Sequence, residues 1–302
     1  MPPPRGYPNF IEGPADYDMT QDVHNDTYSA IESASADFSG KAVYLSGASR
    51  GIGVGIAISF ARAGASKIAV SARSSSQSTV DAMLKAAKEA GRPEPEILSL
   101  AVDLTSMASV TAAAEEIKNK FGRLDIIVNN AGVMTGYQTA VADLSEEDWK
   151  MNFEVNVHGP WRVLKAFLPL LLETEKGSKT IVTVASVGAH LVSPGLSGYQ
   201  TSKLAVLRLT QFAMAEHGSQ GLLTYCVHPG NIDTGMADLA EEIKPIFVDT
   251  PALCGDTLVY LTSERREWLG GRYVNVTWDM PQLMAKEKEL VEGDKLKVRM
   301  VV

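Results

Sequence analysis

The sequence predicts an α/β protein with one doubly wound, parallel, seven-stranded sheet in a single domain. Seven short runs of β-branched and apolar residues alternate with longer stretches of helical periodicity. Parallel strands need long crossover connections, and a sheet covered on both faces has strands that are apolar throughout. No internal repeat or linker interrupts residues 40–280. The predicted strands are 42–47, 67–72, 96–104, 125–132, 180–186, 222–230 and 272–279.

Helical stretches separate these strands, and right-handed crossovers through them give the doubly wound arrangement. They are 51–64, 77–91, 107–121, 145–175, 198–217 and 250–264. Residues 1–38 are rich in Pro, Gly, Asp and Ser and show no sustained period, so we expect an irregular, partly ordered extension draped on the domain. The domain itself is expected over 39–280. Residues 281–302 are charged and then apolar, which indicates a surface helix and a tail that docks.

Composition limits the classes of function. The 302 residues are 45% hydrophobic and 21% charged, as in soluble globular proteins, and the net charge of −8 does not favour nucleic acid or an acidic membrane. No apolar run approaches the roughly 20 residues of a membrane helix, and the first residues lack the apolar core of a signal peptide. Cys226 and Cys254 lie in apolar surroundings without metal-site spacing. We therefore expect reduced, buried thiols, no metal and a cytoplasmic location.

A glycine-rich loop follows the first predicted strand and opens the first helix. The stretch reads SGASRGIG (46–53), with Gly47, Gly51 and Gly53 spaced G-x-x-x-G-x-G. Such glycines let the backbone approach a pyrophosphate, while the helix N-terminus supplies amide donors and a positive dipole end. Glycine-rich turns also serve packing alone, but this position between strand and helix favours a dinucleotide site.

The residues expected near the adenosine ribose favour NADP(H) over NAD(H). The second strand ends at Ala72 and Arg73, where NAD enzymes usually place a carboxylate for the ribose hydroxyls. Arg50 lies within the glycine loop itself. Two guanidinium groups would attract a 2′-phosphate. The alternative interpretation is that both arginines are solvated surface cations.

A second constellation concerns proton transfer. Tyr199 and Lys203 are four residues apart in a helical stretch, so they share one face of the helix. A nearby cation stabilises a phenolate, so the lysine is expected to lower the pKa of Tyr199. Ser186 stands at a predicted strand end, where ligands bind in doubly wound sheets. Taken singly, the three could be a packed aromatic residue, a solvated cation and a hydrogen-bonding serine.

Together with other motifs, these residues resemble the short-chain dehydrogenase/reductase family of the single-domain, Rossmann-like kind. The glycine loop matches T-G-x-x-x-G-x-G with Ser46 in place of threonine, and the family's N-N-A-G motif stands at Asn129 to Gly132. Asn156, Ser186, Tyr199 and Lys203 have the family's order and spacing. The loop HPGNIDT matches P-G-x-x-x-T, and Asp103 with Leu104 matches the adenine contact.

The resemblance implies hydride transfer between a nicotinamide and a carbonyl carbon, with Tyr199 exchanging the proton. Lys203 would lower the tyrosine pKa and bind the nicotinamide ribose, Ser186 would stabilise the oxyanion, and Asn156 would hold a water in a relay to the lysine. Expected catalytic residues are Asn156, Ser186, Tyr199 and Lys203. Expected cofactor-binding residues are Gly47, Ser49, Arg50, Gly51, Ile52, Gly53, Arg73, Asp103, Leu104, Asn130, Ala131, Gly132, Tyr199, Lys203, Pro229, Gly230, Ile232 and Thr234.

The substrate is less defined by the sequence. The flanks resemble those of fungal family members, many of which act in secondary metabolism. The stretch after Thr234 has the position of the substrate loop; its apolar residues indicate either an apolar or polycyclic substrate or the core face of a short helix. These residues are Met236, Leu239, Ile243, Ile246 and Phe247. Pocket contacts are also expected from Val187, His190, Leu191 and Val192, with His190 acting as a hydrogen-bonding or surface residue rather than a second acid.

Three functions remain compatible with the pattern. The first is an NADPH-dependent reductase that interconverts a ketone and a secondary alcohol. The others are a same-fold enzyme with non-redox chemistry (a cyclase, dehydratase or epimerase) and a non-catalytic NADP(H)-binding sensor. The family's four-helix interface, together with surplus apolar residues on 145–175 and 198–217, implies a homodimer or homotetramer.

Overall fold

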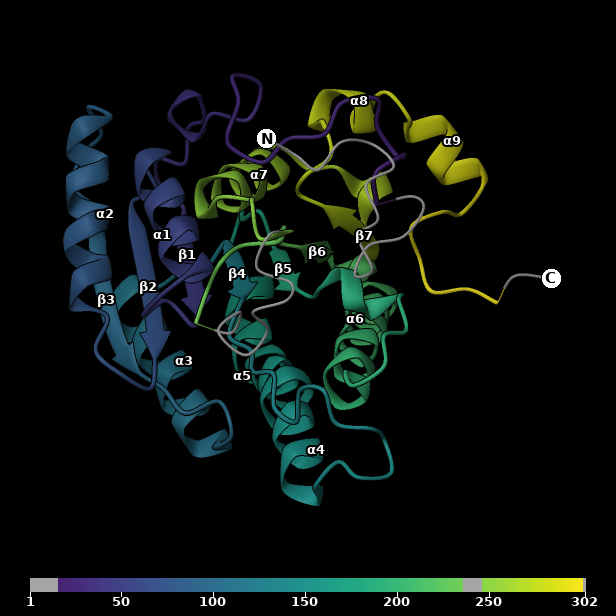
Figure 1. Ribbon diagram of the computed structural model, residues 1–302. Coiled ribbons are helices and arrows are strands. Elements are labelled where there is room, and N and C mark those ends of the chain that lie inside the picture. Colours follow the sequence, from purple (N-terminus) through teal and green to yellow (C-terminus); the bar gives the residue numbers. More distant parts are fainter. Residues whose placement is uncertain (1–15, 236–245, 301–302) are drawn as a thin grey trace.

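A single sheet of seven parallel strands forms the centre of the molecule (Figure 1), as the sequence predicts. The computed structural model describes residues 16–235 and 246–300. The strand order is β3-β2-β1-β4-β5-β6-β7, and every neighbouring pair is parallel. The strands are β1 Ala42–Ser46, β2 Lys67–Ala72, β3 Glu96–Ala101, β4 Ile126–Asn129, β5 Thr180–Val184, β6 Leu223–His228 and β7 Arg272–Asn275.

Helices cover both faces of this sheet. Helices α1, α2 and α7 pack together on one face, while α3, α5 and α6 lie on the other (Figure 1). Several begin at a side-chain cap: Ser106 accepts a hydrogen bond from the Ser109 amide, and Thr250 accepts one from the Leu253 amide. The helices are α1 Ile52–Arg62, α2 Gln77–Glu89, α3 Met107–Phe121, α4 Glu146–Phe153, α5 Gly159–Glu173, α6 Ser197–His217, α7 Pro251–Ser263, α8 Met280–Met284 and α9 Glu287–Glu292.

The stretch predicted as one helix over 145–175 is interrupted. A π-helical turn, Glu154–His158, joins α4 to α5, and the Gly159 amide bonds to the Glu154 carbonyl five residues back. The single-helix prediction is wrong because a π turn keeps the apolar periodicity on both sides while adding one residue locally. This turn carries Asn156.

Six of the strands are shorter than predicted at their carboxyl ends. The predicted runs continue past the last ladder hydrogen bonds, so Gly47, 102–104, 130–132, 185–186, 229–230 and 276–279 lie outside the strands. In a doubly wound sheet these segments form the edge where ligands bind. The expected site residues of these runs therefore lie on loops at this edge.

Asp125 directly precedes β4 and anchors the amino-terminal end of this strand, at the edge of the sheet opposite the ligand-binding edge. Its side chain is fully buried, and its carboxylate accepts hydrogen bonds from the Ala42 amide at 2.8 Å and from Arg123 at 2.8 and 2.9 Å. Burial of a carboxylate is tolerable only when such partners compensate for lost hydration.

The described part of the N-terminal extension packs on the domain. Val23 forms an antiparallel bridge with Trp278, the His24 amide bonds to the Thr277 carbonyl at 2.7 Å, and Phe38 is buried. At the other end of the chain, helix α9 is followed by a tail. Its Leu296 carbonyl accepts a hydrogen bond from the Tyr273 amide at 2.8 Å. The tail thus docks beside β7.

Candidate active site

A cleft of about 650 Å³ opens at the carboxyl ends of β1 and β4. Strand order reverses between these two strands, since β1 leads on to β2 on one side while β4 leads on to β5 on the other. Such a switch point is where ligands bind in open α/β sheets. Nearly all the expected cofactor-binding residues line this cleft; Gly230 and Ile232 instead line a smaller adjoining cavity.

The glycine loop has the geometry that a pyrophosphate needs. Gly47 and Gly51 have φ of +74° and +59°, values that disfavour a side chain. A Cβ on Gly53 would lie 2.2 Å from the Gly47 carbonyl oxygen and 2.8 Å from Nδ2 of Asn130. That Nδ2 donates to the carbonyls of Ser46 and Gly47 at 3.1 and 2.9 Å. The loop thus leaves the N-terminus of α1 open to an anion and fits a dinucleotide phosphate.

Ser46, where the family has threonine, holds the two motifs together. Its hydroxyl accepts hydrogen bonds from the amides of Asn130 and Ala131 at 3.1 and 3.3 Å. Because a serine hydroxyl makes these bonds, the departure from threonine leaves the link between β1 and β4 intact.

The end of the cleft beside β2 contains two arginines, and β2 itself ends without a carboxylate. Ala72, Arg73 and Arg50 line the cleft, and Nη1 of Arg50 lies 3.2 Å from where a Cβ on Gly235 would stand. Asp103 also lines the cleft and has a lowered pKa, mainly because its carboxylate accepts two hydrogen bonds from Thr105, with a smaller contribution from Arg73. The local charge therefore favours an anionic group beside the arginines.

Sequence reasoning missed several residues of the cleft. They lie at strand ends, in the π turn or in adjoining loops and have no motif of their own, although the serine directly after Arg73 and the valine before Asn156 could have been found from their neighbours. The missed residues are Ser71, Ser74, Val102, Thr105, Val133, Val155, Val184, Ala185 and Gly235.

Lys203 and Tyr199 lie on one face of α6, at the inner wall of the cleft. The ammonium of Lys203 is 5.6 Å from the centroid of the Tyr199 ring and donates to the Val184 carbonyl at 3.1 Å. Lys203 is only 4% exposed, and burial lowers its pKa to about 8. A lysine with this pKa still carries its charge at neutral pH.

The expected lowering of the Tyr199 pKa is wrong for this arrangement. Burial raises the pKa of Tyr199, and the hydroxyl of Ser186 opposes this rise only in part. The ammonium lies toward the ring and the Val184 carbonyl, so desolvation of the phenolate outweighs its attraction. Tyr199 is consequently held in its protonated form at neutral pH.

Asn156 joins the π turn to the end of β4. Its Oδ1 accepts from the Val133 amide at 2.8 Å, while Nδ2 donates to the Val133 carbonyl and to Oγ of Ser202, both at 2.9 Å. A Cβ on Gly132 would lie 3.3 Å from both Asn156 Oδ1 and Lys203 Nζ. The asparagine and the lysine thus meet against the same glycine, and the π turn places the asparagine there.

A smaller cavity, of about 130 Å³, adjoins the cleft, and Tyr199 lines both. Ser186 and Val187 stand in its wall beside Tyr199, and Ser186 Oγ also accepts from the Gly188 amide at 3.0 Å. Apolar side chains supply most of the remaining wall. Lining residues that the sequence did not suggest include Met134, Tyr137, Leu196, Gln200 and His228.

The substrate-loop expectations have mixed outcomes. Phe247 lines the smaller cavity, and Ile246 is buried against Phe247 and Tyr137. Met236, Leu239 and Ile243 lie outside the described residues. His190, Leu191 and Val192 do not line this cavity, because the chain turns away after the 3₁₀ turn Val187–Ala189. His190 is a hydrogen-bonding residue, as expected, with Asp16 as its partner at 3.0 Å.

Three further features of the described residues concern the cysteines, metal binding and membrane helices. Cys226 and Cys254 are buried and unpaired, and burial raises the pKa of Cys226 to about 12. Within 16–235 and 246–300, no cluster of three or more His, Cys, Asp or Glu side chains has the geometry of a metal site. No helix in the same ranges is both long and apolar enough to cross a membrane.

Comparison with known proteins identifies the family. Residues 41–244 match the family described as short chain dehydrogenase, so the chain belongs to the short-chain dehydrogenase family and is an oxidoreductase of that class. The short chain dehydrogenase pigC of Monascus ruber is 52% identical over the full length of both chains. The short chain dehydrogenase citE of Monascus ruber is 47% identical over 93% of this chain and 95% of its own.

A more distant relative and a solved structure agree. The short chain dehydrogenase andI of Emericella variicolor is 39% identical over 94% of this chain and 97% of its own. A short-chain type dehydrogenase/reductase from Mycobacterium marinum superposes with a TM-score of 0.70 at 27% identity, covering 82% of this chain and 97% of its own. These matches confirm the resemblance to the family, including its fungal members.

Proposed function

We propose that this protein is an NADP(H)-dependent reductase or dehydrogenase that interconverts a ketone and a secondary alcohol. The observation that carries the proposal is the position of Tyr199, which lines both the cofactor cleft and the smaller apolar cavity. A proton donor at this junction can reach a substrate oxygen while the reacting carbon faces the cleft.

A bound nicotinamide would supply or accept the hydride. Tyr199 gives its phenolic proton to the carbonyl oxygen during reduction, and its raised pKa keeps that proton in place until the oxyanion develops. Ser186 donates a hydrogen bond to the same oxygen. Lys203 is charged below pH 8; it stabilises the Tyr199 phenolate after proton transfer and binds the ribose hydroxyls. Asn156 helps to return a proton to the lysine.

NADP(H) is the proposed cofactor. Arg50 and Arg73 together supply two guanidinium groups at the adenosine end of the cleft, and the end of β2 supplies no acid for a free ribose hydroxyl. Arginine binds phosphate through paired hydrogen bonds, so a 2′-phosphate would be favoured there.

The proposed substrate is an apolar or polycyclic small molecule of fungal secondary metabolism. Met134, Leu196 and Phe247 make the catalytic cavity largely apolar, while Ser186 and Tyr199 give it one polar end. Similarity to proteins of Monascus and Emericella over nearly the whole chain supports the fungal context.

The proposal also extends to assembly and location. Trp161 on α5 and Phe212 on α6 are 45% and 55% exposed, which supports an interface between copies in a homodimer or homotetramer. We place the enzyme in the cytoplasm. We assign catalysis to residues 39–280, with 1–38 and 281–302 as flanking extensions.

The test is oxidation of NADPH, followed by its absorbance, against a panel of apolar ketones. We expect turnover with at least one ketone, and a loss of 10² to 10⁴ in kcat for Tyr199→Phe with the Kd for NADPH nearly unchanged. Unchanged turnover in Tyr199→Phe would refute the proton-transfer role. Binding of NADPH without turnover in either direction would refute the reductase and leave the non-redox or sensor functions.

A further inference from the structure

A cavity larger than the cofactor cleft lies outside the catalytic site. It measures about 1000 Å³ and lies between α6, the segment after Ser186 and the C-terminal tail. We call it the outer cavity. None of Asn156, Ser186, Tyr199 and Lys203 lines it. Gly188 and Gln200 line both the outer cavity and the smaller cavity beside Tyr199, so these two residues separate the two cavities. The side chain of Gln200 is held in place by a hydrogen bond that its Oε1 accepts from the Ser193 amide at 2.8 Å.

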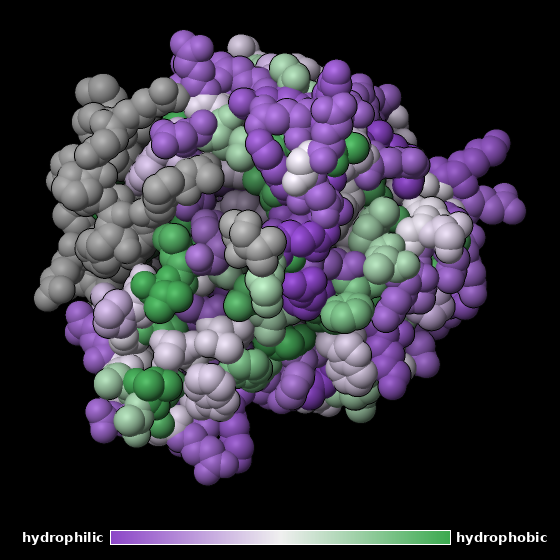
Figure 2. Space-filling model, turned by 90° about the vertical axis from the view of Figure 1, so that its right-hand side faces the viewer, coloured by the Kyte–Doolittle hydropathy of each residue, from purple (hydrophilic) through white to green (hydrophobic). Residues whose placement is uncertain are grey.

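The wall of the outer cavity is mainly apolar. Leu204 and Leu207 come from α6, Leu191 from the segment after Ser186, and Leu296 and Val298 from the tail. Apolar side chains also gather across the face of the molecule that carries α6 and the tail (Figure 2). A cavity of this volume with an apolar wall matches the size range of small-molecule sites.

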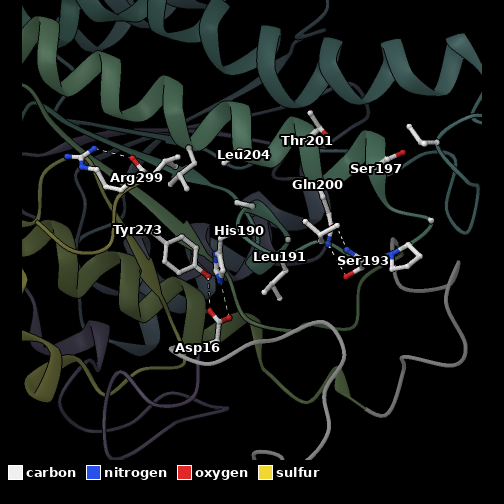
Figure 3. A pocket seen from close by; sticks show the side chains of 18 of the residues that line it. Asp16, His190, Leu191, Ser193, Ser197, Gln200, Thr201, Leu204, Tyr273 and Arg299 are labelled. Atoms are coloured by element: carbon white, nitrogen blue, oxygen red, sulfur yellow. Dashed lines mark hydrogen bonds and ion pairs between the residues drawn. The ribbon is translucent and has the colours of Figure 1, made fainter. Parts of the chain in front are cut away.

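One end of the outer cavity contains a buried carboxylate paired with a histidine. Asp16 is 1% exposed; its carboxylate lies 3.0 Å from Nε2 of His190 and accepts a hydrogen bond from the Tyr273 hydroxyl at 3.4 Å. Figure 3 shows the three side chains meeting on one side of the cavity, opposite Ser193 and Gln200. A buried carboxylate needs such hydrogen-bonding partners, so the pair holds the His190 ring in a fixed orientation.

This pairing sets the hydrogen-bonding capacity of His190. Because Asp16 accepts from Nε2, the neutral imidazole carries its proton on Nε2 and offers Nδ1 as an acceptor. Within the described residues Nδ1 has no hydrogen-bond partner, and the His190 side chain is 35% exposed. The free position on His190 therefore suits a ligand hydroxyl.

The charges at the tail favour an acidic hydroxyl over a neutral one. Lys297 and Arg299 also line the outer cavity, and both pair with a single acid, Asp294, which does not line it. The tail side of the cavity is thus weakly cationic. Partial negative charge on a ligand oxygen would be stabilised from this side.

We propose that the outer cavity is a second small-molecule site, which binds an apolar ring compound with an acidic hydroxyl such as a phenol or enol. The rings fill the space against Leu204 and Leu207, and the hydroxyl donates its hydrogen bond to Nδ1 of His190. This site operates independently of the reductase chemistry, so its failure and that of the proposed reaction are separate results.

The experiment measures, by equilibrium dialysis, the Kd of 2-naphthol and of 2-methoxynaphthalene for the full chain saturated with NADP⁺. The two probes have the same ring system, but only 2-naphthol has an acidic hydroxyl. We expect 2-naphthol to bind about three- to tenfold more tightly than 2-methoxynaphthalene, which is the difference in affinity that one net hydrogen bond gives. Leu204→Trp, at a 41% exposed position, should weaken both probes at least tenfold by filling the cavity. His190→Phe should remove the preference between them.

Two variants serve as controls. Val291→Trp changes a 45% exposed residue of α9 outside the cavity and should leave binding unchanged, as should Met134→Trp, which fills the cavity beside Tyr199 instead. Equal affinity of the wild-type protein for the two probes would overturn the proposal. So would binding that is lost in Met134→Trp but kept in Leu204→Trp, or no binding of either probe, which would mean that a second copy or another segment fills the cavity.

Discussion

Replacing Lys203 by methionine should stabilise the cofactor-free protein while abolishing its activity. Burial lowers the pKa of Lys203 from 10.5 to about 8, a difference of about 2.5 units. At 1.36 kcal/mol per unit, the charged ammonium costs about 3 kcal/mol of folding free energy at pH 7. Methionine has a similar length and no charge. Losing the hydrogen bond to the Val184 carbonyl offsets about 1 kcal/mol, so a net gain of about 2 kcal/mol is expected.

The pH dependence gives an independent check on the sign. Below pH 8 both folded and unfolded states hold the lysine proton, so the full cost is present. Between pH 8 and 10.5 the folded state has lost the Lys203 proton while the unfolded state retains it, so the contribution of Lys203 to the free energy of unfolding rises with pH. In Lys203→Met this contribution should vanish.

The assay is urea unfolding without cofactor at pH 7 and at pH 9.5, with Lys288→Met as the control at an 86% exposed lysine. A Lys203→Met variant that is at least 1 kcal/mol less stable than wild type at pH 7, with Lys288→Met unchanged, would refute the reasoning. It would show that the ammonium stabilises the folded state.

Four further outcomes are expected. Arg73→Asp should raise the KM for NADPH at least tenfold and that for NADH far less; equal effects would remove the 2′-phosphate assignment. Gly53→Ala should raise the Kd for NADPH at least tenfold in a fluorescence titration, because the added Cβ would lie 2.2 Å from the Gly47 carbonyl oxygen. An unchanged Kd would contradict the role of the glycine loop in binding the pyrophosphate. Asp125→Ala should cost about 3 kcal/mol in urea unfolding by leaving Arg123 and the Ala42 amide without their acceptor, and a loss below 1 kcal/mol would show that the buried carboxylate is not needed. Burial lowers the pKa of His228 to about 4, so as the pH falls the unfolded state takes up this proton before the folded state does. The free energy of unfolding should therefore fall between pH 6.5 and 4. His228→Asn should make this fall less steep, and an identical pH dependence would contradict the burial argument.

Much of the fold follows from local pattern. The alternation of apolar runs and helical stretches predicts all seven strands and their parallel pairing, because each connection is long enough for a crossover. The glycine loop predicts its own geometry, since Gly47 and Gly51 adopt backbone angles that other residues avoid. These features depend on residues close together in the chain.

What the sequence did not predict depends on distant contacts. The raised pKa of Tyr199 follows from how completely the tertiary structure encloses its hydroxyl, which the four-residue spacing to Lys203 does not reveal. The outer cavity depends on Asp16 meeting His190 across 174 positions of sequence. The predicted strands extend past the observed ends because apolar character continues into loops that other segments bury, as at Val102 and Ala185.

The π turn between α4 and α5 determines which face of α5 points toward the sheet, relative to the orientation of α4. Each residue of an α-helix turns the chain by about 100°, so removing one residue from 154–158 would convert the turn to α-helix and swing either Asn156 or the inner face of α5 away from its place. Single-residue deletions here should therefore harm the enzyme more than deletions in neighbouring loops. The segment behaves as a geometric spacer whose length, as much as its composition, is fixed.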